Sequence, residues 1–421
     1  MNSFLLKNAR IIDPNSPFHN SKADIYIKNG IVEKVAGNIS QKAGKTIDLK
    51  EKCVAPGFAD IGANFCDPGF EHKETIQSGI QAAVKGGITT VAVSPGTNPY
   101  IDCKSQVEYI IHQSKGALVN VLPLGGISEK GKGENLAELY DMHLAGAVAF
   151  SDGFRPVQNS RLLLKALQYT QPFDGVVFDF PLNQNLRGEG VINEGVVSTK
   201  LGLKPIPDIA EYVQVLRDIQ ILEYAGGNLH LFCIASSKSA GEIAKAKKNL
   251  QLTSSVAAYN LFSDETALET FDTNFKLLPP LKPQKEIEAL KKALKNGSID
   301  CIVSAHQPQD IESKKKEFDL AEFGMIGLQT FFPLVNTALQ KDFSISEIIE
   351  KISINPRKVL QIPIPSIVEG SNAEFTIFSP DEKFILTPED IVSKSKNTPY
   401  THTELKGKVY GIVNNGQVVL Q

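Results

Sequence analysis

Eight short apolar runs alternate with longer amphipathic segments through the middle of the chain. The runs cover residues 54–61, 89–94, 118–124, 145–150, 175–180, 229–235, 250–256 and 299–304. The segments between them are mostly long enough for a helix; residues 208–224, 238–248 and 285–296 carry helical apolar periodicity. A short apolar run can also be a buried helix segment. Eight alternations of this kind, however, predict an α/β fold with a parallel (β/α)8 barrel of the TIM type.

Both ends of the chain follow a different pattern, which is typical of short strands. Residues 4–12 and 24–32 alternate apolar and polar side chains, and a hairpin turn signal lies at 28–30. Residues 374–378 and 409–420 read the same way, with a turn at 414–416. We therefore predict a small composite β domain built from residues 1–52 and 367–421, around a barrel at 53–366. The 421 residues suit one barrel of about 250 residues or more plus a smaller domain.

Composition excludes several classes of partner. Lys plus Arg is 44 and Asp plus Glu is 47, so the net charge is −3, and no basic run predicts nucleic-acid binding. No apolar run approaches the ~20 residues needed to cross a bilayer. The five cysteines are scattered, odd in number and never in a CxxC pair, and the first charged residues follow the N-terminal apolar stretch. We expect a cytoplasmic protein without disulfides, a membrane segment or a secretory signal.

The active site of such a barrel lies at the carboxyl ends of its strands. Short motifs in that region and beyond run in order along the chain: VAPGFAD (54–60), GGITTV (86–91), AFSDG (149–153), GVINEG (190–195), NFKLLPPL (274–281), EFG (322–324), GLQT (327–330) and SKSKNTP (393–399). In this order and spacing the sequence resembles the dihydroorotases of the longer bacterial type, within the amidohydrolase superfamily. The resemblance covers essentially the whole chain.

That resemblance implies a metal site, and most of its residues are replaced here. Active members hold one or two zinc ions through a His-x-His pair, an Asp, two further His and a final Asp that also carries the proton. The matching positions in this sequence are, in order, Gly62 and Asn64, Asp152, Phe180, Cys233, and Ala305. Only the first Asp survives, so five of the six positions have lost the family residue.

The positions that would hold the substrate have changed as well. Where the family has an arginine, two asparagines and a histidine, this chain has Cys66, Gly96, Leu278 and Gln309. His306 matches a family residue that is not a zinc ligand, and we read it as structural or pocket-lining. Asp60 is read as a hydrogen-bonding residue at the end of the first strand. All twelve positions together are interpreted as a vestigial pocket.

Hydrolysis of a cyclic amide needs an activated water, a polarised carbonyl and a proton carrier, and zinc supplies the first two. Glycine, phenylalanine and alanine offer no side-chain lone pair to a metal, and Ala305 cannot act as a base. We therefore expect no catalytic residue and no bound cofactor, a pseudoenzyme with a hydrolase fold. Some dihydroorotase-like chains without metal ligands support the assembly of aspartate carbamoyltransferase. The resemblance implies that role in pyrimidine synthesis here, and a homodimer.

Three alternatives stay open at this point. The chain could be an active dihydroorotase, converting dihydroorotate and water to N-carbamoyl-aspartate, or another cyclic-amide hydrolase with a remodelled metal site. Such a site would be mononuclear, built from Cys66, Asp152, Cys233 and His306. The emptied pocket could also serve a small-molecule sensor.

Overall fold

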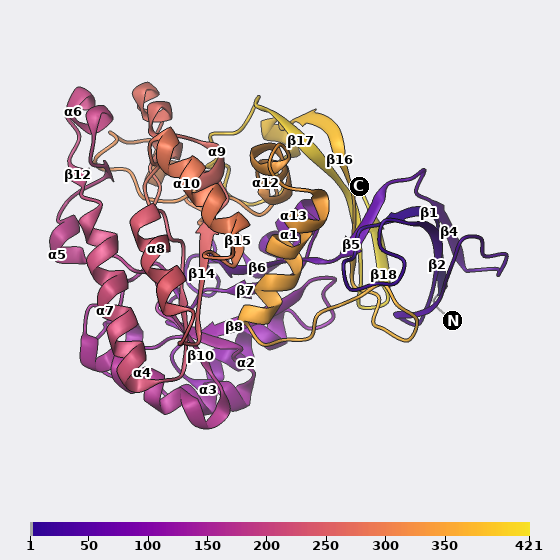
Figure 1. The fold of residues 1–421 in the computed structure, drawn as a ribbon, viewed down its shortest axis with the longest axis horizontal. Coiled ribbons are helices and arrows are strands. Elements are labelled where there is room, and N and C mark those ends of the chain that lie inside the picture. The colour runs from indigo at the N-terminus through magenta and orange to yellow at the C-terminus, as the bar shows by residue number, and fades with distance from the viewer. Residues whose placement is uncertain (1–2) are drawn as a thin grey trace.

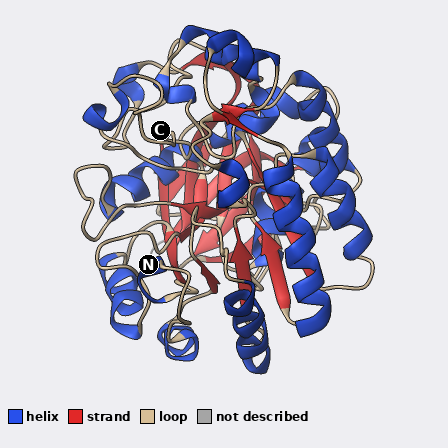
Figure 2. Ribbon diagram, turned by 90° about the vertical axis from the view of Figure 1, so that its left-hand side faces the viewer, coloured by secondary structure: helices blue, strands red, loops and turns tan. Residues whose placement is uncertain are grey.

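The structure is a computed structural model that describes residues 3–421. Its centre is a ring of eight parallel strands, each hydrogen-bonded to its neighbour in chain order (Figure 2). They are β6 (Phe58–Ala63), β7 (Ile88–Val93), β8 (Asn120–Gly125), β9 (Ala149–Ser151), β10 (Val176–Asp179), β13 (Asn228–Leu231), β14 (Leu252–Ala257) and β15 (Cys301–Val303). Between the last strand and the first, the Ser304 N–H donates to Asp60 Oδ1 at 2.7 Å. The predicted barrel is confirmed.

Helices surround the strands (Figure 1). The longer ones are α1 (Ile76–Gly86), α2 (Lys104–Gln113), α3 (Leu139–Ala145), α4 (Ser160–Thr170), α7 (Ile209–Ala225), α8 (Ser237–Ala246), α10 (Gln284–Lys295) and α12 (Phe331–Leu339). Local sequence fixes their ends: Thr75 caps the first turn of α1 with its hydroxyl, and Gly87 ends that helix in a left-handed conformation. The three predicted helices correspond to α7, α8 and α10 within two residues at each end.

Shorter elements lie in the connections. They are the helices α5 (Gln184–Arg187), α6 (Val196–Leu201), α9 (Tyr259–Phe262), α11 (Ile311–Lys314), α13 (Ile345–Ile349) and α14 (Asn355–Val359), the strand pair β11 (Ile192–Asn193) and β12 (Pro205–Ile206), the 3-10 turns η1 (Glu129–Gly131), η2 (Gln171–Phe173), η3 (Glu265–Thr270), η4 (Thr273–Phe275) and η6 (Pro388–Asp390), and the π turn η5 (Glu350–Ile354).

A second sheet is built from both ends of the chain, as predicted. Its strands are β1 (Ser3–Ile11), β2 (Lys22–Lys28), β3 (Ile31–Ala36), β4 (Lys45–Asp48), β5 (Cys53–Pro56), β16 (Phe375–Ile385), β17 (Glu404–Asn414) and β18 (Gln417–Leu420). They lie in the order β18-β17-β16-β5-β1-β2-β3, with β4 also paired to β1. Within this sheet, the antiparallel pairing of β5 with β16 joins strands from the two ends of the chain.

The apolar run 54–61 is two strands rather than the single barrel strand that the sequence predicts. Its first half, β5, belongs to the β domain, where it pairs with β1 and β16. The barrel strand β6 begins only after Gly57. A Cβ at Gly57 would lie 2.0 Å from Thr89 Oγ1, so this position has room for glycine alone. The runs 24–32 and 409–420 likewise divide at their turn signals into the hairpins β2–β3 and β17–β18.

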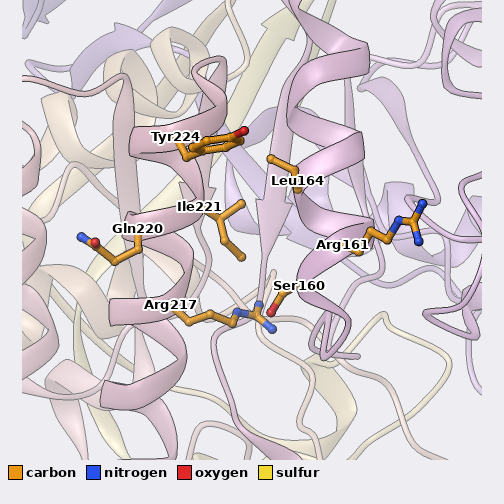
Figure 3. A pocket seen from close by; sticks show the side chains of 7 residues that line it. All are labelled: Ser160, Arg161, Leu164, Arg217, Gln220, Ile221 and Tyr224. Carbon is orange, nitrogen blue, oxygen red and sulfur yellow. The ribbon is translucent and has the colours of Figure 1, made fainter.

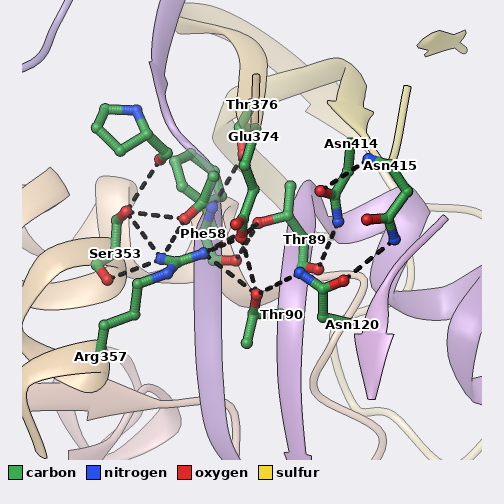
Figure 4. Close-up of polar contacts among 12 residues, drawn as sticks. Phe58, Thr89, Thr90, Asn120, Ser353, Arg357, Glu374, Thr376, Asn414 and Asn415 are labelled. Carbon is green, nitrogen blue, oxygen red and sulfur yellow. Dashed lines mark hydrogen bonds and ion pairs between the residues drawn. The ribbon is translucent and has the colours of Figure 1, made fainter. Parts of the chain in front are cut away.

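A buried arginine joins the barrel to the β domain (Figure 4). Arg357, on α14, donates through Nη1 to the Gly57 carbonyl at 2.6 Å and to the Ser353 carbonyl at 2.9 Å. Its Nη2 donates to Thr89 Oγ1 at 3.1 Å and forms an ion pair with Glu374, directly before β16. The Glu374 carboxylate also accepts from Thr89 Oγ1 at 2.7 Å. One guanidinium therefore links a barrel helix, a barrel strand and the second sheet.

Two asparagines at the end of β17 extend the same junction. Asn414 Nδ2 donates to the carbonyls of Thr89 at 3.1 Å and Leu118 at 2.8 Å. Asn415 Nδ2 donates to Asn120 Oδ1 at 3.1 Å (Figure 4). The turn that the sequence predicts at 414–416 thus contacts the bottom of the barrel as well as reversing the chain.

Candidate functional site

Asn64, in the loop after β6, is hydrogen-bonded both within this loop and to the residues that follow β15. The Asn64 side-chain oxygen accepts from the Cys66 N–H at 2.9 Å, and the Asn64 N–H donates to the His306 carbonyl at 2.9 Å. Cys66 adopts a left-handed backbone with φ of 60° and is 2% exposed. Burial raises the pKa of its thiol to about 12, which disfavours the reactive thiolate form.

Asp152, at the one position that keeps the family residue, accepts four hydrogen bonds from the protein. Its Oδ1 accepts from the N–H groups of Ile127 at 2.9 Å and Ser128 at 3.1 Å and from the Tyr100 hydroxyl at 3.1 Å. Its Oδ2 accepts from Ser128 Oγ at 2.6 Å. Burial raises the pKa of this carboxyl, and the hydrogen bonds oppose that rise. The side chain therefore ties the loop after β8 to the end of β9.

Phenylalanine side chains fill the barrel mouth over Gly62. A Cβ built on Gly62 would lie 2.2 Å from Cζ and 2.3 Å from Cε2 of Phe232. The Phe232 ring packs edge-on against Phe154, with ring centroids 5.3 Å apart, and Phe154 lies 5.3 Å from Phe180. We call Phe154, Phe180 and Phe232 the phenylalanine plug. The cavity beside it has a volume of about 10 Å³, room for about one water molecule.

Left-handed backbone marks two further mouth positions. Cys233 and Ala305 follow β13 and β15 with φ of 59° and 50°. Such conformations are uncommon for residues with a side chain and concentrate at functional sites. Cys233 is 1% exposed, and burial raises the pKa of its thiol well above the ordinary value. Alanine has no side-chain atom that could bind a metal, and the Cys233 thiol is buried.

Asp60 and His306 hold the seam where the barrel closes. Asp60 accepts from Ser304 through both oxygens, from the N–H at 2.7 Å and the hydroxyl at 2.6 Å. His306 Nδ1 accepts from the Gly327 N–H at 3.0 Å, so the proton lies on Nε2, which faces Glu74 Oε2 at 3.6 Å. Both are buried and neither lines the cavity above Gly62.

The substrate-side positions are dispersed around the mouth. Gly96 lies near Asn64: a Cβ built there would be 4.0 Å from Asn64 Nδ2. Leu278 is buried. Gln309 accepts from Lys73 Nζ at 2.8 Å and donates to the Phe323 carbonyl at 2.8 Å. Of these positions, Gly96 and Leu278 have no polar side-chain group, and the Gln309 amide is hydrogen-bonded within the protein.

The residues present do not fit a zinc ion. Within residues 3–421, no three His, Cys, Asp or Glu side chains are grouped so that they could hold a metal. The mononuclear site from Cys66, Asp152, Cys233 and His306 is therefore not assembled. A zinc ligand at position 62 would have to occupy the space of the Phe232 ring.

The sequence reasoning missed Phe154 and Phe232. Phe154 lies two residues after Asp152, and Phe232 directly precedes Cys233. Phe180, which the sequence places among the pocket positions, lies next to Phe154. The plug could have been predicted from the sequence by one pattern. A bulky residue stands at the end of one barrel strand, and a glycine stands at the end of another.

His230 lies under the plug as a neutral imidazole. Its Nδ1 is 2.9 Å from Thr253 Oγ1 and its Nε2 is 3.0 Å from Ser255 Oγ, while its ring centroid is 4.4 Å from that of Phe178. Burial, with a smaller effect from Lys247, lowers the pKa of this side chain to about 3. In the unfolded chain the value is about 6.5.

This shift predicts loss of stability in mild acid. Between pH 6.5 and 3 the unfolded chain binds a proton that the folded protein excludes, so lowering the pH favours unfolding. The expected loss attributable to His230 between pH 7 and pH 5 is about 2 kcal/mol. Urea unfolding of the wild type and of His230→Gln at both pH values measures it. An equal pH effect in both proteins would contradict the assignment to His230.

A larger groove lies away from the mouth, on the outer surface between α4 and α7 (Figure 3). Its volume is about 330 Å³, and it is lined by Ser160, Arg161, Leu164, Arg217, Gln220, Ile221 and Tyr224. The Arg217 guanidinium is engaged by the buried Asp218 carboxylate at 2.5 Å. The groove is mostly apolar and contains no grouping of catalytic side chains.

No helix among the described residues is long and apolar enough to cross a membrane.

Solved structures share this architecture over the full chain. L-hydantoinase (dihydropyrimidinase) from Arthrobacter aurescens superposes with a TM-score of 0.87, covering 100% of this chain and 96% of that one at 22% identity. D-hydantoinase (dihydropyrimidinase) from Thermus sp. gives a TM-score of 0.82, covering 99% and 95% at 19% identity. At such identities the likeness establishes the fold alone.

Sequence comparison narrows the class. The profile of the Dihydro-orotase-like family matches residues 51–240, and that of the Amidohydrolase family matches residues 191–419. A dihydroorotase of Acetivibrio thermocellus is 38% identical, covering 99% of each chain, and one of Thermoanaerobacter sp. is 39% identical, covering 98% of this chain and 96% of its own. The chain belongs to the dihydroorotase-like amidohydrolases, and the family expected from its sequence is confirmed.

Proposed function

We propose that this chain is a dihydroorotase-like protein of pyrimidine biosynthesis that does not hydrolyse dihydroorotate and acts as a structural or regulatory partner of aspartate carbamoyltransferase. The observation that supports the loss of hydrolysis is the position of the Phe232 ring, whose atoms occupy the side-chain space of position 62. In active members of the family that this chain resembles, a zinc ligand occupies the matching position.

The rest of the mouth supports the same conclusion. A cavity of about 10 Å³ is far smaller than the ~300–1,000 Å³ of ordinary ligand sites. Asp152 accepts four hydrogen bonds from the protein, and Ala305 has no group that could move a proton. The chain thus lacks the groups that would activate water, polarise the carbonyl and carry the proton.

The test is a dihydroorotate assay in both directions, on purified protein preincubated with zinc, with bound metal quantified on the same sample. We expect less than 0.1 zinc per chain and no turnover above background, compared with about 10 s⁻¹ for an ordinary enzyme. The dihydroorotase of Acetivibrio thermocellus, prepared in parallel, is the matched positive control. Stoichiometric zinc with turnover would refute the loss of activity.

The partner role has a separate test. Aspartate carbamoyltransferase from the same organism, mixed with this protein at micromolar concentrations, should form a complex on size-exclusion chromatography with light scattering. The free protein should elute as a homodimer in the same experiment. The transferase should also be more active or more stable in the complex. Absence of association at these concentrations would remove the proposed partner while leaving the assay result in place.

A second candidate is an active dihydroorotase or related cyclic-amide hydrolase with a remodelled site. Identity of 38% over the full length of a chain named dihydroorotase favours it. It requires the mouth to open by movement of the phenylalanine plug. The zinc and turnover measurements separate the two candidates directly.

A further inference from the structure

Nothing in the backbone requires glycine at position 62. Gly62 lies inside β6, and its φ is outside the left-handed region where glycine is favoured. Glycine inside a strand weakens that strand, because it has no side chain to pack and loses more conformational freedom on folding. The reason for glycine at this position must therefore be spatial.

The space is taken by one side chain. The two ring atoms of Phe232 that face Gly62 would lie 2.2 and 2.3 Å from a Cβ, closer than non-bonded atoms can approach. The ring has little freedom to move aside: Phe232 is 4% exposed, Phe154 packs against it, and the adjoining cavity is about 10 Å³. Even alanine at position 62 would force the ring or the strand to shift.

We infer that the Phe232 ring and any side chain at position 62 exclude each other, so that these two residues form an interlocked pair closing the barrel mouth. A metal ligand could return to position 62 only in a protein that had first lost the ring. Restoring family residues at the other mouth positions would not by itself restore the site. This inference deepens the proposed loss of the zinc site but does not depend on the partner.

A double-mutant cycle tests the interlock through the urea unfolding equilibrium of the full chain. Gly62→Ala should raise the unfolding equilibrium constant about 5- to 150-fold in the wild-type background, the effect of overpacking a core. In the Phe232→Ala background the same change should produce no increase, because the added methyl group enters vacated space. Phe232→Leu replaces Phe232→Ala if the latter does not fold.

Gly96→Ala is the matched control. Gly96 lies at the same mouth, also outside the left-handed region, and a Cβ there would have 3.8 Å to its nearest neighbour, Ser94 Oγ. We expect Gly96→Ala to leave the unfolding constant unchanged within about threefold in both backgrounds. An equal destabilisation by Gly62→Ala with and without the ring would overturn the interlock. Zinc-dependent turnover by the wild type would instead overturn the proposed function, so the two failures are distinguishable.

Discussion

Replacing Arg357 by methionine is expected to destabilise the folded protein by about 3–5 kcal/mol, since it leaves the Glu374 carboxylate buried without its partner. The loss should be seen in urea unfolding followed by circular dichroism. Both the barrel and the β domain contribute to this junction, so signals from both should move to lower urea. The double variant Arg357→Met with Glu374→Gln should recover part of the loss, because it removes the uncompensated charge.

Arg161→Met is the control for this experiment. Arg161 is exposed on α4. Its replacement should change the free energy of unfolding by no more than about 0.5 kcal/mol. A loss below 1 kcal/mol for Arg357→Met would show that the buried pair contributes little, and that the junction is held by packing.

Asp152→Ala is expected to lower the free energy of unfolding by about 3–5 kcal/mol, with zinc content unchanged. The change leaves two backbone N–H groups and two hydroxyls without their acceptor. Buried donors without an acceptor lower the free energy of unfolding. If Asp152 were instead a metal ligand, the variant would lose metal and activity at modest cost in stability. Metal analysis and urea unfolding of the same preparation therefore decide between the two roles.

Asp152→Asn is the companion variant. Its side-chain oxygen can still accept from Ile127 and Tyr100, whereas its amide nitrogen faces Ser128 Oγ, which can reverse its own hydrogen bond. We expect about half the loss seen for Asp152→Ala. A full loss in both variants would indicate that the negative charge, rather than the hydrogen-bond geometry, is what the surrounding loop requires.

Much of the fold follows from local sequence. The barrel strands are short apolar runs bounded by helical segments, and α7, α8 and α10 appear where their periodicity predicts them. The division of the run 54–61 could not be predicted in the same way. Both halves are apolar, and the break depends on Gly57 meeting Thr89, a contact that exists only once the barrel has formed.

The candidate site, too, could be predicted from the sequence only in part. Gly62 and Ala305 have no side-chain atoms that could bind a metal. This follows from their residue types, so the sequence alone predicts it. The hydrogen bonds to Asp152 could not be predicted from the sequence, because the donors lie in the connections after β7 and β8. The steric contact between Gly62, on β6, and Phe232, after β13, involves residues that are far apart in the chain. Only the folded barrel brings them together.

The pairing of β5 with β16 has a consequence for how the chain is made. On the ribosome, β1 to β5 emerge first and can pair with one another, but the open edge of β5 waits until residue 378 has been synthesised. An unpaired strand edge invites pairing with other chains. A translation product that stops after the barrel would keep this edge exposed. We expect such truncated chains to aggregate through β5 even when their barrel is intact.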